Sequence, residues 1–386
     1  MHFRQRIKGI IGGLFSAAGL LALAGCGGGG GGGSSHTPFS VMYCTNAFSY
    51  DISQYKIAPN GALSTLAPNI RYTVNVNGLP GSESINFDPS HRHAYLANLG
   101  ASTIDEFLVN SDGSLTYFGT YTMDQGANSS EPSIVVFSAN GKFAYATSES
   151  RTNHKLTEFT VKPNGALALL GSIDTGNDVG HIVVDPQGRY LYVTSYFGNT
   201  VTRYPMNADG TIGAGLTPLP TGAGPFAQTM TPNGSFLYVT NLGTLFPPYS
   251  PIPGTIDEFR VEADGSLTSI GSLNAGTGPG FLTVSRDSKF AYVGNLHDTT
   301  VMVFAIQGDG SLSLIQTFNT GNGPVQVTFS PDGRFAYIAL TGANLASSST
   351  DANSIVECTV NADGTLTQFG TVAAGAGPDF MLAQTL

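Results

Sequence analysis

The sequence of 386 residues contains no tryptophan, only three cysteines and few charged residues, which make up 11% of the chain. Such a low charge content disfavours long solvated helices, and the chain has no basic run and no segment in which Lys or Arg alternates with aromatic residues. Nucleic-acid binding therefore has no electrostatic basis, because phosphate contacts need clustered cations. Glycine is abundant instead, with 50 residues, which suits many short strands joined by tight turns.

Residues 1–25 have the pattern of a bacterial lipoprotein signal peptide. Arg4, Arg6 and Lys8 precede an apolar segment, residues 10–22, that is too short and too rich in glycine for a comfortable membrane span. The segment ends in Leu-Ala-Gly-Cys26, which resembles the lipobox, and this resemblance implies lipidation of Cys26 and a place in the cell envelope, on the periplasmic or surface side of a membrane. The alternative is an ordinary secretory signal that happens to be followed by a cysteine.

Residues 26–38 are predicted to be the lipidated cysteine and a flexible tether, since a run of glycines followed by small polar residues cannot bury a core. A dozen such residues have a reach of about 20 Å, enough to hold a domain clear of lipid headgroups. The membrane is therefore the first expected partner. Residues 39–386 remain as one folded domain, expected to be monomeric.

One motif recurs through that domain and is clearest at residues 329–337, where an apolar run, a Ser-Pro-Asp-Gly turn and alternating apolar residues predict a hairpin. Its closing tyrosine recurs about every 45 to 54 residues, at Tyr43, Tyr95, Tyr145, Tyr192, Tyr238, Tyr292 and Tyr337. A two-residue Asn-Gly or Asp-Gly turn follows each tyrosine in phase. Four antiparallel strands per period indicate an all-β fold, a seven-bladed β-propeller.

The two ends of the domain predict how the ring closes. The chain enters at residues 39–45 on what is already the second strand of a repeat, and it ends with a first strand after Gly377-Pro378. We therefore expect residues 380–386 to pair beside residues 39–45, so that the C-terminal strand completes the N-terminal blade and removes exposed edges.

Two cysteines remain besides Cys26. Cys44 and Cys358 both fall in predicted strands, and Cys358 takes the place of an aromatic residue in the repeat. In an oxidising compartment the two thiols could form a disulfide, but we favour two separately buried thiols, since nothing in the sequence brings them together.

The Gly-x-Gly-Pro strand entries, the Ser-Pro-Asp-Gly-Arg-Phe-Ala-Tyr hairpin and the segment Val-Asn-Ala-Asp-Gly-Thr-Leu-Thr at 360–367 resemble the lactonase family of seven-bladed propellers. That family includes 6-phosphogluconolactonase and the fungal carboxymuconate lactonising enzymes, and it shades into non-catalytic envelope proteins of the YncE type. The resemblance implies a catalytic face built from a His at the start of an innermost strand, an Arg-His pair in the next blade and a Glu after that blade's second strand.

This chain keeps only part of that set. His181 matches the family histidine, but Phe226 and Ala227 stand where the Arg-His pair is expected and Leu242 stands at the Glu position. Opening a lactone needs a base and a positive group for the developing charge, so these departures put the activity in doubt. Glu149 and Arg151, in the loop before the blade of His181, are a candidate replacement. A solvated ion pair is the plainer interpretation of those two residues.

Other candidate ligand-binding residues lie on the same face. Glu83, Gln326 and Asp379 are expected to face the channel and could bind a cation or sugar hydroxyls. Phe246 and Tyr249 belong to a proline-rich insertion at 242–254 that suits a recognition rim or a tolerated surface loop. Their spacing carries no metal signature, and no cofactor is expected. His91 and His93 flank a turn on the opposite face and are expected to be exposed.

These observations favour a lipid-anchored propeller that binds a carbohydrate-like ligand, a glycan or a protein through its channel face. A lactone hydrolase of the 6-phosphogluconolactonase type, acting outside the cytoplasm, is the alternative, with His181, Glu149 and Arg151 as its residues. A repeat scaffold for protein assembly is the third possibility.

Overall fold

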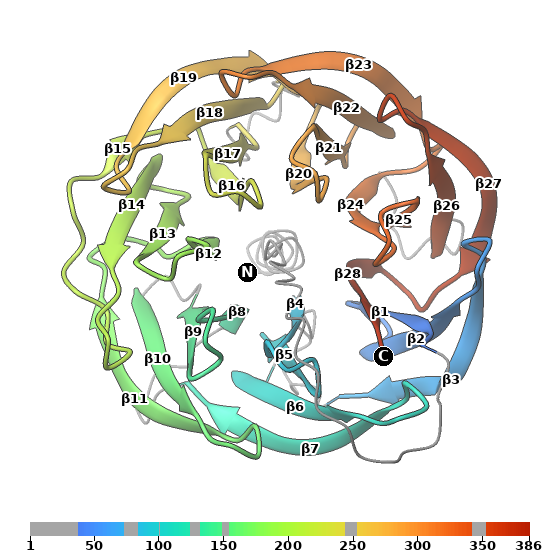
Figure 1. The fold of residues 1–386 in the computed structure, drawn as a ribbon, viewed down its shortest axis with the longest axis horizontal. Helices are drawn as coiled ribbons and strands as arrows, with labels where there is room; N and C mark the ends of the chain where they lie inside the picture. Colours follow the sequence, from blue (N-terminus) through green and yellow to red (C-terminus); the bar gives the residue numbers. More distant parts are fainter. Residues whose placement is uncertain are drawn as a thin grey trace, which may run out of the picture.

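The computed structural model describes residues 38–72, 84–99, 101–123, 132–148, 154–243, 253–341 and 353–386. Within these ranges the chain forms strands and no helix, arranged as seven antiparallel sheets of four strands around a central channel (Figure 1). The predicted seven-bladed propeller is confirmed. None of the described residues belongs to a helix that could cross a membrane.

We number the blades in chain order and list their strands from the channel outward. The innermost strands are β28 (Pro378–Thr385), β4 (Ser84–Phe87), β8 (Pro132–Phe137), β12 (Ile182–Val184), β16 (Pro225–Met230), β20 (Pro279–Val284) and β24 (Pro324–Phe329). The second strands are β1 (Ser40–Asn46), β5 (His93–Asn98), β9 (Phe143–Ser148), β13 (Tyr190–Ser195), β17 (Phe236–Asn241), β21 (Phe290–Asn295) and β25 (Phe335–Leu340).

The two outer strands of each blade complete this list. The third strands are β2 (Asp51–Ile57), β6 (Thr103–Val109), β10 (Lys155–Val161), β14 (Thr200–Pro205), β18 (Thr255–Val261), β22 (Thr300–Ile306) and β26 (Ser354–Val360). The outermost are β3 (Leu63–Arg71), β7 (Leu115–Thr122), β11 (Leu167–Asp174), β15 (Leu219–Pro220), β19 (Leu267–Asn274), β23 (Leu312–Asn319) and β27 (Leu366–Ala373).

The ring closes in blade 1, where the last strand of the chain pairs with the first. β28 is antiparallel to β1, with Ser40 opposite Thr385 and Cys44 opposite Met381 (Figure 1). This confirms the predicted closure. It also covers the edge of β1, which would otherwise offer unpaired N–H and C=O groups to another chain.

The tyrosines that revealed the repeat hold neighbouring blades together. All seven are fully buried, and each hydroxyl donates to the carbonyl of the glycine in the outer turn of the next blade, at 2.6 to 3.1 Å. We call this contact the tyrosine latch. The last one runs from Tyr337 to Gly61 and so ties blade 7 to blade 1.

The latched turns require glycine. At Gly210 φ is +87°, in the left-handed region, and a Cβ atom would lie 2.1 Å from the ring of Phe143 in the preceding blade. The Asn-Gly and Asp-Gly pairs therefore do two things: they allow the tight turn, and they let the turn backbone approach the neighbouring aromatic residue.

A second contact across the seams comes from the third strand, opposite the tyrosine, in every blade except blade 6. In three seams a glutamate oxygen accepts the N–H of the residue two places after the next blade's turn glycine, at 2.6 to 2.8 Å: Glu158 from Ile212, Glu258 from Leu312 and Glu357 from Leu63. Gln54 makes the same bond to Leu115 from blade 1, and Gln316 of β23 makes it to Leu366.

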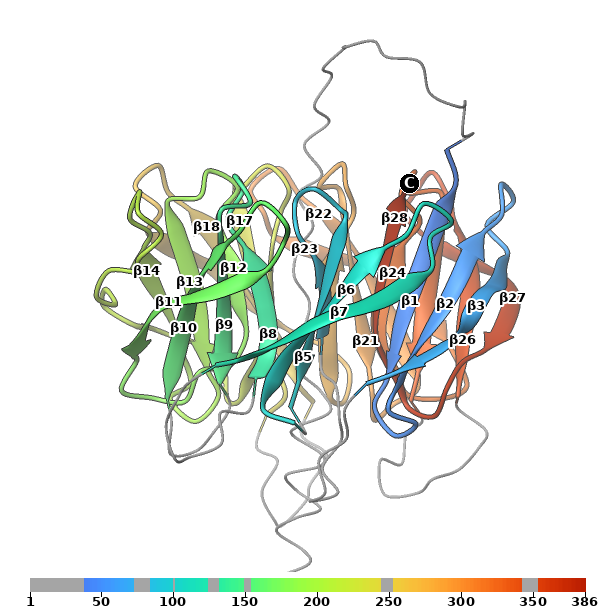
Figure 2. The ribbon, with the colours of Figure 1, turned by 90° about the horizontal axis from the view of Figure 1, so that it is seen from below.

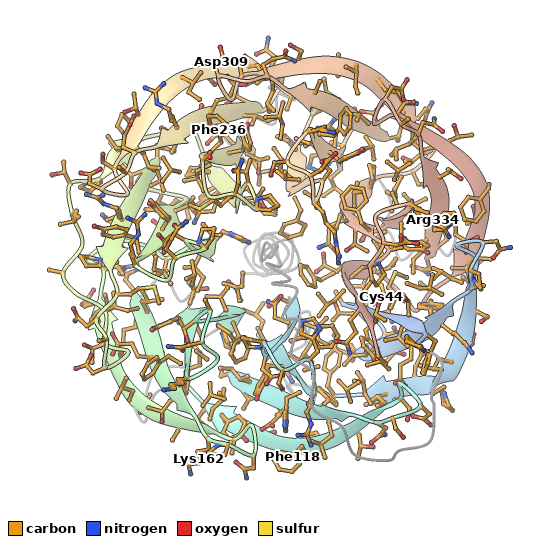
Figure 3. All side chains as sticks on the ribbon, in the orientation of Figure 1. Cys44, Phe118, Lys162, Phe236, Asp309 and Arg334 are labelled. Carbon is orange, nitrogen blue, oxygen red and sulfur yellow. The ribbon has the colours of Figure 1, made fainter. Side chains whose placement is uncertain are left out.

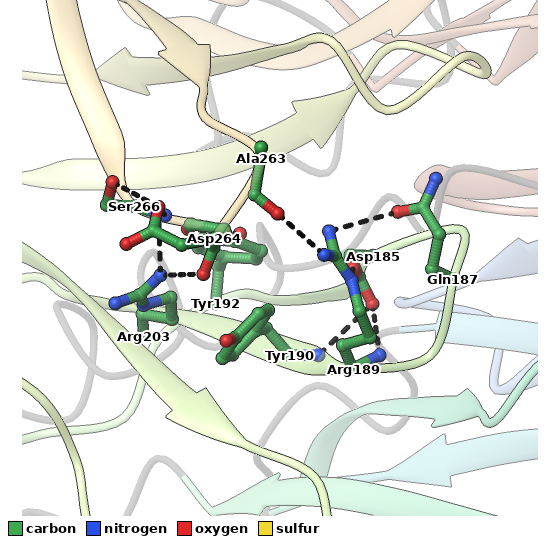
Figure 4. A network of polar contacts seen from close by, with 10 residues as sticks. Asp185, Gln187, Arg189, Tyr190, Tyr192, Arg203, Ala263, Asp264 and Ser266 are labelled. Atoms are coloured by element: carbon green, nitrogen blue, oxygen red, sulfur yellow. Dashed lines mark hydrogen bonds and ion pairs between the residues drawn. The ribbon is translucent and has the colours of Figure 1, made fainter.

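The seam between blades 4 and 5 is built differently, because Arg203 stands at the glutamate position. Its Nη1 donates to the Asp264 carbonyl at 2.5 Å, and its guanidinium lies 4.6 Å from the centre of the Tyr190 ring. Arg189 lies 5.5 Å from the same ring and donates to the Ala263 carbonyl (Figure 4). Two cations on one aromatic ring thus replace the carboxylate contact.

Side chains fill the space between the blades, and both cysteines are part of that packing (Figure 3). Cys44 and Cys358 are buried and free, as favoured from the sequence. Burial raises the pKa of the Cys358 thiol to about 12, so it is inert at neutral pH.

Candidate functional site

The candidate site lies where the innermost strands begin, on the face that also carries the connections between second and third strands (Figure 2). Several of these strands begin at proline, as in β16, β20, β24 and β28, and the residue before the proline is glycine in all four. Gly224, Gly278 and Gly377 all have φ between +63° and +68°, which bends the chain from the rim into the channel wall.

The structure places the three described candidate residues on three different blades: His181 in blade 4, Gln326 in blade 7 and Asp379 in blade 1. Glu83, Glu149, Arg151, Phe246, Tyr249 and Cys26 lie outside the described residues, and the roles given to them stay predictions.

His181 directly precedes β12, and its backbone is held on both sides. Its N–H donates to Thr194 Oγ1 at 2.9 Å, and its carbonyl accepts from the Thr194 N–H at 3.0 Å and from Gln228 Nε2 at 2.8 Å. The residue is fully buried. A histidine with so rigid a backbone is well placed to hold one ring orientation.

The amide oxygen of Gln326, in β24, is hydrogen-bonded within the fold. Gln326 Oε1 accepts from the backbone N–H of Met381 at 2.5 Å, which joins blade 7 to β28 of blade 1. Gln228 of β16 bonds to the preceding blade instead, donating to two carbonyls of blade 4. These inner amides therefore join blades as well as line the channel wall.

Asp379, the second residue of β28, is a buried carboxyl group without a partner. Neither of its oxygens has a hydrogen-bond partner among the described residues, and burial raises its pKa well above the ordinary range. Burial and the neighbouring Asp379 also raise the pKa of the Cys44 thiol. In its protonated form, which burial favours, Asp379 can donate a hydrogen bond as well as accept one.

Two more unsatisfied polar groups lie on β4, which packs beside β28 in the channel wall (Figure 1). Ser84 Oγ and Asn86 Oδ1 are buried and have no hydrogen-bond partner within the described ranges. The Asn86 Nδ2 is used, since it donates to the Val135 carbonyl of β8 at 2.9 Å. Buried polar groups are nearly always satisfied, so these unpaired groups on β28 and β4 mark places where a ligand or water is needed.

An apolar cluster of inner-strand side chains adjoins these polar groups. Phe281 of β20 lies 5.6 Å from Phe226 of β16 and 6.2 Å from Phe380 of β28, measured between ring centres. Phe226, Ala227 and Leu242, which replace the family's Arg-His pair and Glu, are all buried in the same apolar cluster. No Lys or Arg occurs on any of the seven innermost strands that the structure describes.

The opposite face corrects one expectation. His93 is buried, only 7% exposed, and His91 is partly buried, whereas the turn position predicted two exposed side chains. His93 Nδ1 lies 2.7 Å from Glu106 Oε1, a partner 13 residues away on the third strand of the same blade. The repeat contained the signal, because the aligned residues in the next blades are Phe143, Tyr190 and Phe236, all of which face a seam.

The fold, the Gly-Pro entries and the innermost histidine together define a propeller of the lactonase type. The family model described as "Lactonase, 7-bladed beta-propeller" matches residues 120–385, and the chain belongs to this family.

Two curated relatives are 6-phosphogluconolactonases. The enzyme from Serratia proteamaculans is 27% identical over 38% of this chain and 43% of its own length, and that from Enterobacter sp. is 26% identical over 42% and 50%. The matched region thus spans about half the length of these relatives or less. Among solved structures, the periplasmic gluconolactonase PpgL of Pseudomonas aeruginosa has a TM-score of 0.73 at 18% identity, covering 90% of this chain and 99% of that one. A likeness at that identity shows the fold.

Proposed function

We propose that this propeller binds a neutral, hydroxyl-rich ring, a sugar or a sugar lactone, against the channel wall formed by β28 and β4. The observation that carries the proposal is that these two neighbouring inner strands hold three buried side chains with unpaired polar atoms, Ser84, Asn86 and Asp379. Together they offer a hydroxyl, an amide oxygen and a carboxyl group, which are the groups that sugar hydroxyls pair with. A ligand that satisfied them would remove the cost of leaving them unpaired.

The charge of the wall supports a neutral ligand over a phosphorylated one. Phosphate is bound by Arg, Lys or clustered backbone N–H groups, and the described innermost strands carry no Arg or Lys. Asp379 adds negative charge whenever it ionises. Phe226, Phe281 and Phe380, on the inner strands of three blades, lie close to one another and supply apolar rings of the kind that pack against the C–H face of a sugar ring.

The test is a binding titration of the purified domain with glucose, other neutral hexoses, their 1,5-lactones and the matching 6-phosphates. Ser84→Ala and Asp379→Asn are expected to weaken binding of the neutral ligands about tenfold, the cost of one lost hydrogen bond of about 1.4 kcal/mol. The matched control is Ser133→Ala, because Ser133 is the second residue of the neighbouring strand β8 but its hydroxyl is already bonded to Thr147 Oγ1 at 3.0 Å. Binding that prefers the phosphates, or an equal loss from Ser133→Ala, would overturn the proposal.

Lactone hydrolysis is the second candidate, favoured by membership of the lactonase family and by the position of His181. Two of the proteins to which this chain is similar are named 6-phosphogluconolactonase and a third is named a periplasmic gluconolactonase. Hydrolysis of sugar lactones that is abolished by His181→Ala would establish this activity. If the wild type binds lactones but does not hydrolyse them, the hydrolase candidate is rejected and the binding function is retained.

We also propose that the domain is held in the cell envelope by a lipid on Cys26, as the sequence of the first 38 residues predicts. Stable anchoring needs more than one acyl chain, and the lipoprotein pathway supplies them. Cys26→Ser is expected to release the protein from the membrane fraction, whereas wild-type protein found in the soluble fraction would refute the anchor.

A further inference from the structure

The seam between blades 2 and 3 contains three buried or half-buried titratable side chains in contact. His93 Nδ1 lies 2.7 Å from Glu106 Oε1, and the Tyr121 hydroxyl donates to the other carboxylate oxygen. Glu106 is fully buried and His93 is nearly so. Neither the histidine nor the tyrosine belongs to the candidate channel site, which lies at the opposite end of the strands.

Comparison with the other blades shows that two of these three residues are exceptions to the repeat. The strand pairings align His93 with residues that are apolar or aromatic in every other blade, namely Val41, Phe143, Tyr190, Phe236, Phe290 and Phe335. They align Tyr121 with Ile70, Ile173, Leu273, Phe318 and Val372. The two exceptions occur in one blade and contact one carboxylate, so the cluster is a single unit.

The cluster also changes how this seam is bonded. In three other seams a glutamate accepts the N–H of the residue two places after the next blade's turn glycine. Here the Tyr121 phenol oxygen is hydrogen-bonded to the backbone of Leu167, which is that residue in blade 3, and the phenol donates onward to Glu106. The contact between blades 2 and 3 therefore runs through the carboxylate that His93 also holds.

The surroundings leave His93 as the partner that can neutralise Glu106. The other titratable groups nearby are the phenols of Tyr95 and Tyr117 and the carboxyl of Asp88, in the turn before β5. Asp88 Oδ1 accepts the backbone N–H of His93 at 3.1 Å. Across the seam, the facing turn presents the backbone of Gly165, and its Lys162 side chain is exposed. Burial raises the pKa of the Glu106 carboxyl, which means that the ionised form is costly unless a positive charge lies beside it.

We propose that the seam between blades 2 and 3 is a proton-sensitive joint, tight when a proton on His93 balances the Glu106 carboxylate and looser when that proton is lost. Histidine is the side chain whose charge changes between pH 5 and 8. Above that range a buried carboxylate remains with only a neutral imidazole and a phenol as partners. Because burial raises the pKa of the Glu106 carboxyl, the folded cluster favours the protonated form, so its contribution to stability is largest on the acid side and falls as pH rises.

The joint is connected to the channel wall. Asn86, on the innermost strand of blade 2, donates to the Val135 carbonyl of blade 3 across the same seam. Loosening the seam would therefore change the spacing of β4 and β8. The joint itself does not depend on any ligand, so it can be tested whether or not the channel binds a sugar.

Hydrogen exchange on the purified domain tests the joint directly. We expect the peptide around Leu167 to become about tenfold less protected between pH 5.5 and 8.5, after correction for the intrinsic rate. The peptide around Leu115, whose N–H is held by the neutral Gln54 in the seam between blades 1 and 2, serves as the internal control and should not change. Equal pH dependence of the two peptides would overturn the proposal.

Two further measurements complete the test. The double variant His93→Phe with Tyr121→Ile copies the residues of blade 3 and should remove the histidine-linked pH dependence at Leu167. If that variant does not fold, the imidazole resonances of wild-type His93 still decide: they must report a change of protonation between pH 5 and 8.5. A ring that keeps one protonation state throughout would refute the joint.

Discussion

The seams on the two sides of blade 3 have the same backbone geometry and different chemistry. Tyr95 and Tyr145 make the same latch, to Gly165 at 2.7 Å and to Gly210 at 3.1 Å. Each seam also has a buried glutamate opposite the tyrosine. In the seam between blades 3 and 4, Glu158 accepts a backbone N–H directly and has only apolar neighbours in the aligned positions, whereas Glu106 is held by a histidine and a tyrosine.

This difference shows that the latch and the carboxylate have separate tasks. The tyrosine and the turn glycine set the distance between blades and are the same in all seven seams. The position of the carboxylate is taken by Gln54 in blade 1 and by Arg203 in blade 4. In both cases the replacing side chain still forms a hydrogen bond with the backbone of the next blade. The variable position is therefore where a single seam can acquire a property of its own.

The largest effect is expected from filling the turn glycine. Gly165→Ala and Gly210→Ala should each lower the free energy of unfolding by about 3 kcal/mol, the sum of left-handed backbone strain and overpacking. The new Cβ would lie 2.4 Å from His93 Nδ1 in one seam and 2.1 Å from Phe143 in the other. Gly188→Ala, with φ +67° and no atom within 4 Å, is the control and should cost about 1 kcal/mol by chemical denaturation. Equal costs for all three would contradict the packing argument.

A smaller effect is expected from removing the latch hydroxyl. Tyr95→Phe and Tyr145→Phe leave a buried glycine carbonyl unpaired and should each cost about 1 to 2 kcal/mol. The shorter bond predicts the larger loss for Tyr95. Tyr117→Phe is the control, because its hydroxyl bonds to Thr120 at the exposed rim and should matter little. A result in which the rim tyrosine costs as much as the buried ones would refute a role for the latch in stability.

The smallest effect concerns the charge of the second contact. Burial raises the pKa of the Glu158 carboxyl, so the folded state binds its proton more tightly than the unfolded chain. Stability from this residue is therefore present below the ordinary carboxyl pKa and is lost as pH rises through the raised value. Glu158→Gln keeps the acceptor for the Ile212 N–H and should leave Tm unchanged near pH 4 but raise it by about 1 to 2 °C at pH 7.5.

The reverse change in blade 1 provides the matched test of that small effect. Gln54→Glu should reduce Tm at pH 7.5 and not near pH 4, since it introduces a buried charge where a neutral amide now bonds to Leu115. If Glu158→Gln destabilises the protein at both pH values, the carboxylate contributes more than its acceptor oxygen and the comparison between seams must be revised.

Much of the architecture could be predicted from the residues alone. The tyrosines, the Asp-Gly turns and the incomplete first and last repeats predict seven blades and closure by the C-terminal strand, because turn chemistry and strand alternation act over a few neighbouring residues and are repeated seven times. The same repeat predicts that Cys358 packs as a core residue. Seven copies of one local signal average out the ambiguity that any single hairpin would leave.

The site could be predicted only in part. The sequence places His181, Gln326 and Asp379 at the starts of innermost strands, but it does not show that Gln326 is used by the Met381 N–H or that Asp379 has no described partner. It also suggests an exposed His93, which the seam buries. These outcomes depend on atoms of another blade or another strand, and the partner is set by how the blades pack against each other.

The chain by itself therefore determined the repeat, the strand order and the closed ring of this protein, since each follows from local backbone preferences and apolar alternation. Only the tertiary structure decided which polar groups are satisfied: Glu106 by His93 and Tyr121, and Ser84 and Asp379 by no described residue. The physical reason is that a hydrogen bond needs two groups within about 3 Å, and the seams and the channel wall bring together residues from separate strands and blades.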